Sequence, residues 1–293
     1  MAEQMTFKRY EIKYAVTETQ RQRLIDGMQE YMIRDSHGIS QIQSLYFDTP
    51  DYLLARRSME HPLYKEKIRL RSYGQADDHT KVFLELKKKF EGVVYKRRVS
   101  MDMTKAEELM ENWSSNRYGV TEVDCNPQIL RELEASVARY PKLIPRILLT
   151  YRREAFYQRD NHDFRVTLDQ EIGWRNEDLS LRDPMIGRPL LKQSYYLMEV
   201  KAGGAIPLWF TKLLTELGIR KTSFSKYGTA YQTIFLEHND PLGLSAQVRT
   251  WSHAALEPHI PAWNPGKEPS RDRRAWNLSY KLPDIDADHL LHA

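Results

Sequence analysis

The chain has 293 residues and a formal net charge of +4 at pH 7, and its residues are 41% hydrophobic and 11% aromatic. This apolar content supports a sizeable core and excludes an intrinsically disordered protein. The mild positive charge argues against a protein that binds nucleic acid through its bulk charge. The single cysteine, Cys125, excludes an intramolecular disulfide and a cysteine-rich metal site.

The N-terminal segment has no apolar core typical of a signal peptide, and no run approaches the roughly 18 apolar residues of a transmembrane helix. We therefore expect a cytoplasmic protein with no membrane span in this chain. An association with an integral membrane partner stays open, because such a partner leaves no pattern in this sequence.

The first predicted strand covers residues 7–14, FKRYEIKY. Its charged residues Arg9, Glu11 and Lys13 alternate with aromatic and aliphatic residues. Since alternate residues of a strand share a face, one face of this strand carries the charges and the other is apolar.

The next predicted elements are one helix and four strands. Thr17 can cap a helix that runs to about Tyr31, in which apolar residues recur at four-residue intervals. A strand at residues 42–48 ends in a turn, and a polar connection that contains Arg56 and Arg57 leads on. Short turns then separate three strands of an antiparallel meander, at residues 65–73, 81–88 and 93–101.

The second half of the chain mixes helices and strands. Two short helices are predicted from Thr104 and from Pro127, and the second runs to about Tyr140. An amphipathic helix has proline in its first turn and Gly218 just past its end. This helix covers residues 207–217. The remaining predictions are strands at residues 145–159, 164–169 and 194–201, and a helix at residues 225–237.

About eight strands in antiparallel order, with helices between them, predict an α+β fold with a closed or nearly closed antiparallel β-barrel. The alternation of the first strand recurs in the later strands, so the apolar residues lie opposite the charges. Because burying many unpaired cations would be prohibitive, we expect a wet or anion-filled basic interior with helices packed outside. The charges that recur on one strand face are Lys67, Arg69, Arg71, Glu85, Lys87, Lys96, Arg98, Arg165, Asp169, Glu199 and Lys201.

We expect this barrel domain to occupy residues 1–239. From residue 240 onward, prolines interrupt any periodicity, although Trp251, Trp263 and Trp276 are unusual for a purely disordered segment. We interpret residues 240–293 as an irregular C-terminal extension.

Short segments along the chain match one known family in the same order. The segments are FKRYEIKY, SLYFDT, KIRLRSYG, FLELKKK with YKRRVSM, YRREAF, FRVTLD, LMEVK and FSKY, and they span Phe7 to about Tyr227. On these segments the chain resembles the polyphosphate polymerase domain of the vacuolar transporter chaperone (VTC) family, within the triphosphate tunnel metalloenzyme (CYTH-like) superfamily. The resemblance implies a triphosphate tunnel, an antiparallel β-barrel lined with basic residues and a few acids.

The resemblance also implies an ATP-dependent polyphosphate polymerase, which transfers the γ-phosphate of ATP to a growing polyphosphate chain. Its cofactor would be Mn²⁺ or Mg²⁺, and its partners would be ATP and polyphosphate. Phosphoryl transfer depends on positioning and charge neutralisation more than on covalent help from the protein. The residues that this resemblance assigns to catalysis are Arg69, Arg71, Lys87 and Lys226. The candidates for substrate binding, from the resemblance or from their place on the charged strand face, are Arg9, Lys13, Lys67, Lys96, Arg98, Arg153, Arg165, Lys201 and Ser225.

The acidic residues on the same face are candidates for the metal site, since hard divalent cations prefer oxygen ligands. Glu199 matches the metal-ligating glutamate of the family. Glu11 and Glu85 are either second ligands or salt-bridge partners that hold lysines in place. Asp169 is expected to be a structural partner of Arg165.

Two other functions stay open. One is a triphosphatase of the same superfamily, which would hydrolyse tripolyphosphate or a nucleoside or thiamine triphosphate. The acidic ExExK signature of that superfamily is RYEIK here, with Arg9 in place of the first glutamate, which favours holding a long polyanion. The other is a non-catalytic module that binds polyphosphate or inositol phosphates, but Glu199 argues against it because a binding module needs no metal carboxylate. Nucleic acid is not an expected partner, since no nucleic-acid-binding motif is present.

Overall fold

The computed structural model describes residues 10–60, 62–91, 93–140, 142–192 and 194–238. The strands are β1 (Tyr10–Thr17), β2 (Met32–Asp48), β3 (Tyr64–Tyr73), β4 (Lys81–Phe90), β5 (Val93–Asp102), β6 (Ile144–Gln158), β7 (Arg165–Arg175), β8 (Arg188–Pro189), β9 (Tyr195–Ala202) and β10 (Lys221–Thr222). The helices are α1 (Glu18–Met28), α2 (Leu53–Met59), α3 (Met103–Ser114), α4 (Pro127–Ala138), α5 (Leu208–Glu216) and α6 (Lys226–His238). Residues 240–293, expected to form an irregular extension, lie outside the described residues.

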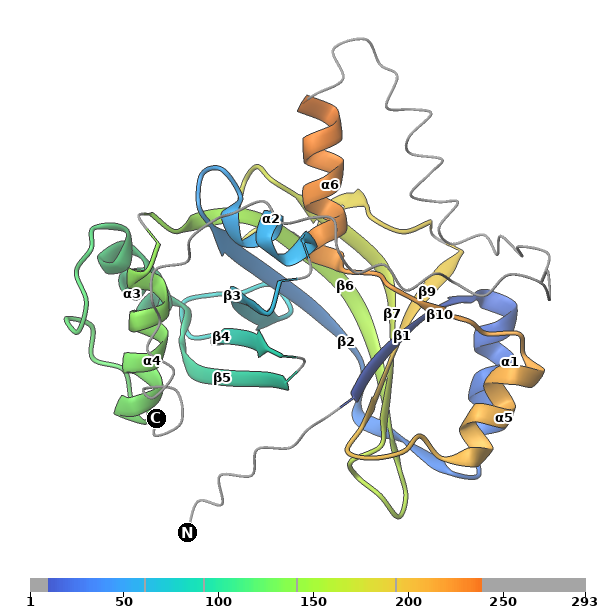
Figure 1. The fold of residues 1–293 in the computed structure, drawn as a ribbon. Coiled ribbons are helices and arrows are strands. Elements are labelled where there is room, and N and C mark those ends of the chain that lie inside the picture. The colour runs from blue at the N-terminus through green and yellow to red at the C-terminus, as the bar shows by residue number, and fades with distance from the viewer. Residues whose placement is uncertain (1–9, 61, 92, 141, 193, 239–293) are drawn as a thin grey trace. The chain divides into compact units, whose positions relative to one another are not determined.

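All ten strands belong to one antiparallel sheet, in the order β10-β1-β9-β7-β6-β2-β3-β4-β5, with β8 added beside β7. The predicted α+β class and the antiparallel pairing are therefore confirmed. The sheet is not closed, because β5 and β10 are its two edges. It is strongly curved (Figure 1), so that Lys87 of β4 and Glu11 of β1 meet across the concave side, with 3.1 Å between nitrogen and oxygen. The expected tunnel is thus formed by an open, curved sheet.

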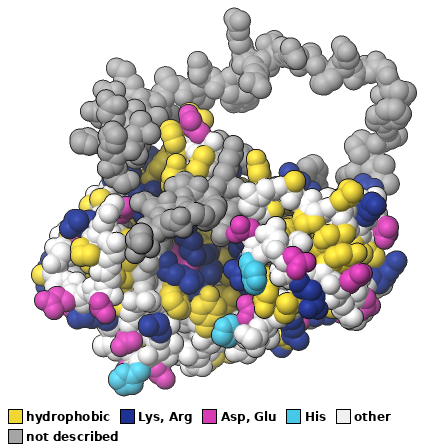
Figure 2. Space-filling model, turned by 90° about the horizontal axis from the view of Figure 1, so that it is seen from below, with side chains coloured by type: hydrophobic (Ala, Val, Ile, Leu, Met, Phe, Trp, Pro, Cys, Tyr) yellow, Lys and Arg dark blue, Asp and Glu magenta, His cyan; other side chains and the backbone are white. Residues whose placement is uncertain are grey.

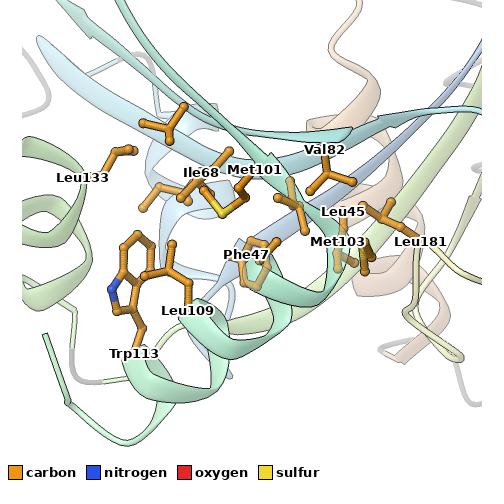
Figure 3. Close-up of a cluster of buried hydrophobic side chains, with 14 of the residues drawn as sticks. Leu45, Phe47, Ile68, Val82, Met101, Met103, Leu109, Trp113, Leu133 and Leu181 are labelled. Atoms are coloured by element: carbon orange, nitrogen blue, oxygen red, sulfur yellow. The ribbon is translucent and has the colours of Figure 1, made fainter. Parts of the chain in front are cut away.

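One apolar cluster lies on the convex side of β2, β3, β4 and β5 and is covered by α3 and α4. Leu45 and Phe47 of β2 and Ile68 of β3 are buried there beneath Leu109 and Trp113 of α3, as Figure 3 shows. These residues are the apolar half of the alternation in each strand. Burial of each such side chain stabilises the fold by about 1.5–3 kcal/mol.

A second apolar cluster covers the convex side of β1, β7 and β9 with α1 and α5. Thr17 begins α1 with a capping box, in which Gln20 is the reciprocal partner. After α5, Gly218 adopts a φ of +63°, which glycine tolerates best, and it turns the chain toward β10. These features agree with the predicted helix boundaries to within a few residues.

The third cluster differs from the expected arrangement, because α2 and α6 pack on the concave side. Tyr227, Ala230 and Ile234 of α6 are buried against Ile147 and Leu149 of β6. The concave face is therefore apolar where α6 covers it and charged elsewhere. Helices pack both outside and inside the curved sheet, whereas the sequence analysis expected them only outside.

Two further differences concern local structure. The segment with Arg56 and Arg57, expected as a polar connection, forms α2. The carboxylate of Asp48 accepts hydrogen bonds from the backbone of Leu54 and Ala55 at 2.8 and 2.9 Å, which stabilises the start of this helix. The strand β2 begins earlier than predicted, at Met32 instead of Ile42. Its pairing with β6 has a register shift between Arg34 and Ile39. None of the helices in the described part of the chain is long and apolar enough to cross a membrane.

Candidate functional site

The charged strand faces meet on the concave side of the sheet, where Figure 2 shows Lys and Arg side chains gathered in a hollow. The residue just before α6 also contributes to this surface, since Lys67 donates a hydrogen bond to Ser225 at 3.2 Å. We call this surface the basic face. Among the described residues its cations are Lys13, Lys65, Lys67, Arg69, Arg71, Lys87, Lys89, Lys96, Arg98, Arg153, Arg165, Lys201 and Lys226, and its acids are Glu11, Glu85, Asp169 and Glu199.

Glu85 of β4 is surrounded by cations from both neighbouring strands. Arg69, Lys96 and Arg98 each place a nitrogen 2.7 Å from one of its oxygens, and Arg71 lies 3.8 Å away. The Glu85 side chain is only 2% exposed. Burial by itself would raise the pKa of Glu85, but these cations hold it well below its ordinary range. Glu85 therefore stays ionised and fixes the directions of several cations.

Asp169 of β7 is the centre of a second ionic cluster. Arg153 donates to its two oxygens at 2.5 and 2.7 Å, and Lys226 of α6 donates at 2.5 Å. Asp169 is fully buried. Burial by itself would raise its pKa, but Arg153 and Lys226 have the larger effect and bring the pKa below its ordinary value. The expected pairing of Asp169 with Arg165 is wrong. Asp169 and Arg153 are register partners across β6 and β7, whereas Arg165 is four residues away on the same strand, about 13 Å along it.

Glu199 of β9 lies beside this second cluster but is held less tightly. Its oxygens are 3.4 Å from Arg153, 3.4 Å from Lys226 and 3.6 Å from Lys13. Burial opposes its charge, yet Lys226 and Arg153 keep the pKa of Glu199 well below its ordinary range. Glu199 is thus a buried, ionised carboxylate whose cationic neighbours lie beyond the usual distance of a strong hydrogen bond.

Glu11 of β1 lies near Glu199 at the same part of the face. It contacts Lys87 at 3.1 Å and Lys13 at 3.8 Å, and its side chain is 29% exposed. Burial raises the pKa of Glu11 and so does the nearby charge of Glu199, but Lys87 and the other lysines around it bring this pKa below its ordinary value. Lys13 lies between them, because it contacts both.

A half-buried lysine, Lys67, and two tyrosines complete the basic face. Burial lowers the pKa of Lys67 to about 8. Arg69 donates to the hydroxyl of Tyr46 at 2.8 Å, and Arg71 donates to that of Tyr151 at 3.2 Å. Burial favours the neutral phenol of Tyr46, but Arg69 and Lys67 lower its pKa to about 8. The site is therefore rich in groups whose charge changes just above neutral pH.

Comparison with known families gives a match to the model of the VTC domain over residues 8–235. The chain belongs to the VTC domain family. The match covers more than half of the chain, includes β1 to β10 and reaches into α6. The resemblance stated from the sequence motifs is confirmed at the level of the family.

Two solved structures are similar to this VTC domain in backbone arrangement. One is a proposed adenylate cyclase from Vibrio parahaemolyticus, with a TM-score of 0.41 and 12% identity over 78% of this chain and 99% of the other. The second is the Mediator head module of Schizosaccharomyces pombe, with a TM-score of 0.37 and 10% identity over 72% of this chain and 90% of the other. No curated protein matches the chain significantly. Neither structure bears on the chemistry of the basic face.

The carboxylates differ in how well they fit a divalent cation. The described residues contain no group of three or more His, Cys, Asp and Glu that could hold a metal by itself. Mg²⁺ commonly takes only one or two protein carboxylates and completes its ligands with phosphate oxygens and water. Glu199 fits this pattern, since its cationic neighbours lie 3.4 Å or more from its oxygens. Glu11 also fits it, because it has one close cation, Lys87 at 3.1 Å, and is partly exposed. Glu85 fits it poorly, because a metal would have to displace cations already at 2.7 Å.

The predicted site residues fall into three groups in the structure. Most of them belong to the two ionic clusters or to the hollow between them. Arg165 and Lys201 are register partners at one end of the face, where Arg165 is exposed. Arg9 lies outside the described residues. The sequence analysis missed the tyrosines and the role of Asp169. Tyr151 lies two residues from Arg153 on β6, which is the signal that could have identified it, whereas Tyr46 reaches the face as the register partner of Arg69.

Proposed function

We propose that this VTC domain is a polyphosphate polymerase that transfers the γ-phosphate of ATP to the end of a polyphosphate chain. The observation that carries the proposal is the charge imbalance of the basic face. Its cations extend along the sheet beyond both ionic clusters, whereas its acids are few and mostly engaged by cations. A surface of this kind suits a long polyanion, which brings its own negative charge to cations that lie outside the two ionic clusters, such as Lys89 and Arg165.

Positioning is the main contribution that the side chains would make to this reaction. Arg69 and Arg71 are oriented by Glu85 and by the hydroxyls of Tyr46 and Tyr151, so their guanidinium groups can clamp phosphate oxygens with little loss of conformational freedom. The two arginines would hold the donor phosphates in line with the acceptor chain. Lys87, Lys226 and the other cations would neutralise the charge that spreads over the transferring group.

Glu199 and Glu11 would hold the divalent cation, Mn²⁺ or Mg²⁺. When bound, such an ion would neutralise the negative charge of the phosphate groups. Lys13 contacts both glutamates and would keep their charges balanced before the nucleotide arrives. In our proposal Glu85 has another role, which is to orient its surrounding arginines and Lys96.

The competing function is a triphosphatase with water as the acceptor. Activating water is helped by additional acidic groups near the metal, and this chain has Arg9 at the position of the first acidic residue of the ExExK signature. The cation-rich face therefore favours a phosphate chain as the acceptor. A hydrolase would nevertheless use the same donor site, so only product analysis separates the two functions.

The test is to incubate the purified protein with ATP and Mn²⁺ and to follow ADP, free phosphate and polyphosphate in parallel. We expect a ladder of chains on a stained gel, with ADP formed at a matching rate. Arg69→Ala and Glu199→Gln should each reduce chain formation by at least about a hundred-fold, since each removes a charge from the reacting region. Free phosphate without chains would contradict the polymerase and indicate the triphosphatase.

Arg97 provides a matched control on the same strand as Lys96 and Arg98. It points to the convex side, where it contacts Glu132 of α4 at 2.6 Å. Arg97→Ala removes one arginine from the protein without altering the basic face. Chain formation by this variant should stay within about two-fold of that by the unmodified protein, as expected for a surface ion pair far from the reaction.

A further inference from the structure

An exposed aromatic residue continues the basic face at one end of β3. Tyr73 comes two residues after Arg71 on the same strand face, and it is 47% exposed. Its ring packs edge-on against Phe83 of β4, with 5.7 Å between centroids and an angle of 85°. The guanidinium group of Arg98 on β5 lies over the ring of Phe83, 4.3 Å from its centroid.

Tyr73 is held in place by these two neighbours. Phe83 packs against the ring, and Arg98 lies near the hydroxyl, where it lowers the pKa of Tyr73 although burial by itself would raise it. Arg98 is itself fixed by Glu85 at 2.7 Å. An isolated exposed aromatic residue needs no explanation. This one is pre-oriented and lies next in line after Arg69 and Arg71, so a ligand could stack on it at little entropic cost.

The opposite end of β3 is covered. Lys65 donates to the backbone of Ser58 in α2 at 3.3 Å, and Lys67 donates to Ser225 just before α6 at 3.2 Å. Since α2 and α6 occupy that end, a bulky group attached to the phosphates has more room at the Tyr73 end. Two residues of a strand span about 6–7 Å, which leaves space for a sugar between a phosphate on Arg71 and a flat ring on Tyr73.

We propose that Tyr73, supported by Phe83 and Arg98, stacks against the base of the donor nucleotide whose phosphates lie on Arg71 and Arg69. This inference rests on the proposed function. Every base has a π-face that can stack on an aromatic ring, and the stacking is stronger for a larger ring system. Tyr73 therefore favours nucleoside triphosphates over inorganic tripolyphosphate, and it favours the larger purine rings over pyrimidines.

The test measures binding of ATP, CTP and tripolyphosphate by calorimetry at fixed Mn²⁺ concentration. The unmodified protein should bind ATP more tightly than CTP, which carries the same charge. Tyr73→Ala should weaken ATP binding on the order of ten-fold, and it should leave tripolyphosphate binding within about two-fold because no phosphate contact is removed. Tyr73→Phe should keep the ATP affinity, because the ring remains.

Equal losses of ATP and tripolyphosphate affinity in Tyr73→Ala would overturn the inference, and so would an unchanged ATP affinity. Retained tripolyphosphate binding also reports that the variant is folded. If the unmodified protein binds ATP through Tyr73 but forms no chains, only the proposed function fails. If it binds neither ATP nor tripolyphosphate, both fail.

Discussion

Glu85 is a buried carboxylate that contacts four cations on the two neighbouring strands, β3 and β5. An ionised group in this position is stable only because the cations compensate its charge, and the cations are in turn kept close together by the carboxylate. The same residue was a candidate metal ligand in the sequence. The structure shows it holding Arg69, Lys96 and Arg98 at 2.7 Å, and in our proposal it orients these cations toward phosphate oxygens.

Replacement of Glu85 by glutamine separates these two roles. Glu85→Gln keeps the shape of the side chain but leaves the surrounding cations without their common partner. We expect the free energy of unfolding to fall by about 3 kcal/mol, as is typical when one partner of a buried ion pair is removed. Urea denaturation measures this change. A variant with unaltered stability that no longer binds Mn²⁺ would show that Glu85 is a metal ligand.

The charge state of Lys67 predicts how binding depends on pH. The pKa of Lys67 is lowered to about 8, so the lysine is cationic below this pH and neutral above it. Tyr46, whose pKa is also about 8, gains a negative charge over the same range. Both changes disfavour an anionic ligand, so tripolyphosphate affinity should fall as pH rises from 7 to 9. Titration calorimetry in two buffers should also detect proton uptake on binding near pH 8.

Lys67→Arg is the control for this pH dependence, because arginine stays charged throughout the range. Its tripolyphosphate affinity should decline less between pH 7 and pH 9 than that of the unmodified protein. An equal decline in both proteins would assign the pH dependence to other groups on the basic face.

At the scale of elements, the position of α6 is the feature on which the site depends. Tyr227 donates a hydrogen bond to Asp48 at the end of β2 and stacks on Tyr46, with 4.5 Å between ring centroids. Asp48 also accepts hydrogen bonds from the first turn of α2. This anchor places Ser225 and Lys226, the residues just before Tyr227, among the charges of the basic face.

Loss of the Tyr227 hydroxyl should loosen this anchor. Tyr227→Phe leaves the ring stack intact but removes one donor from the buried Asp48. We expect the free energy of unfolding to fall by about 1.5–3 kcal/mol, the range for hydrogen bonds to charged groups. Tripolyphosphate should also bind more weakly, because Lys226 is less firmly placed. The control is Tyr231→Phe on the same helix, whose ring lies at a tilt 5.3 Å from Tyr52 and should tolerate the change. Unchanged tripolyphosphate binding by Tyr227→Phe would contradict a positioning role for the anchor.

Most elements could be predicted from the sequence, but the placement of α6 could not. Alternation in the strands and the caps of α1 and α5 are local signals, which short-range physics determines. The apolar residues of α6 are compatible with packing on either side of the sheet. Only the contact with Tyr46 and the hydrogen bond to Asp48, both distant in sequence, select the concave side.

At the scale of the whole molecule, alternation shows which residues share a face but not which strands are neighbours. The pairing of β1 with β9 and the open edge at β5 depend on contacts between distant segments. The same limit applies to the site. The cations of the basic face could be identified from the sequence and the family resemblance, whereas the pairing of Asp169 with Arg153 and Lys226 required the sheet register.

The central claim is that the basic face is a path for a long phosphate chain, not a pocket for a single triphosphate. Arg165 and Lys201 lie on the concave face near one end of β7 and β9, where a chain longer than tripolyphosphate would reach them. Replacing both by alanine removes two cations from this end of the path.

The most direct test is the salt dependence of binding for tripolyphosphate and for longer polyphosphates. Each phosphate that a cation neutralises releases condensed counterions, so the slope of log affinity against log salt reports the number of contacts. We predict a steeper slope for the longer chains, and a loss of that increase in the Arg165→Ala, Lys201→Ala double variant. Equal slopes for all chain lengths would contradict the account and indicate a site built for one triphosphate.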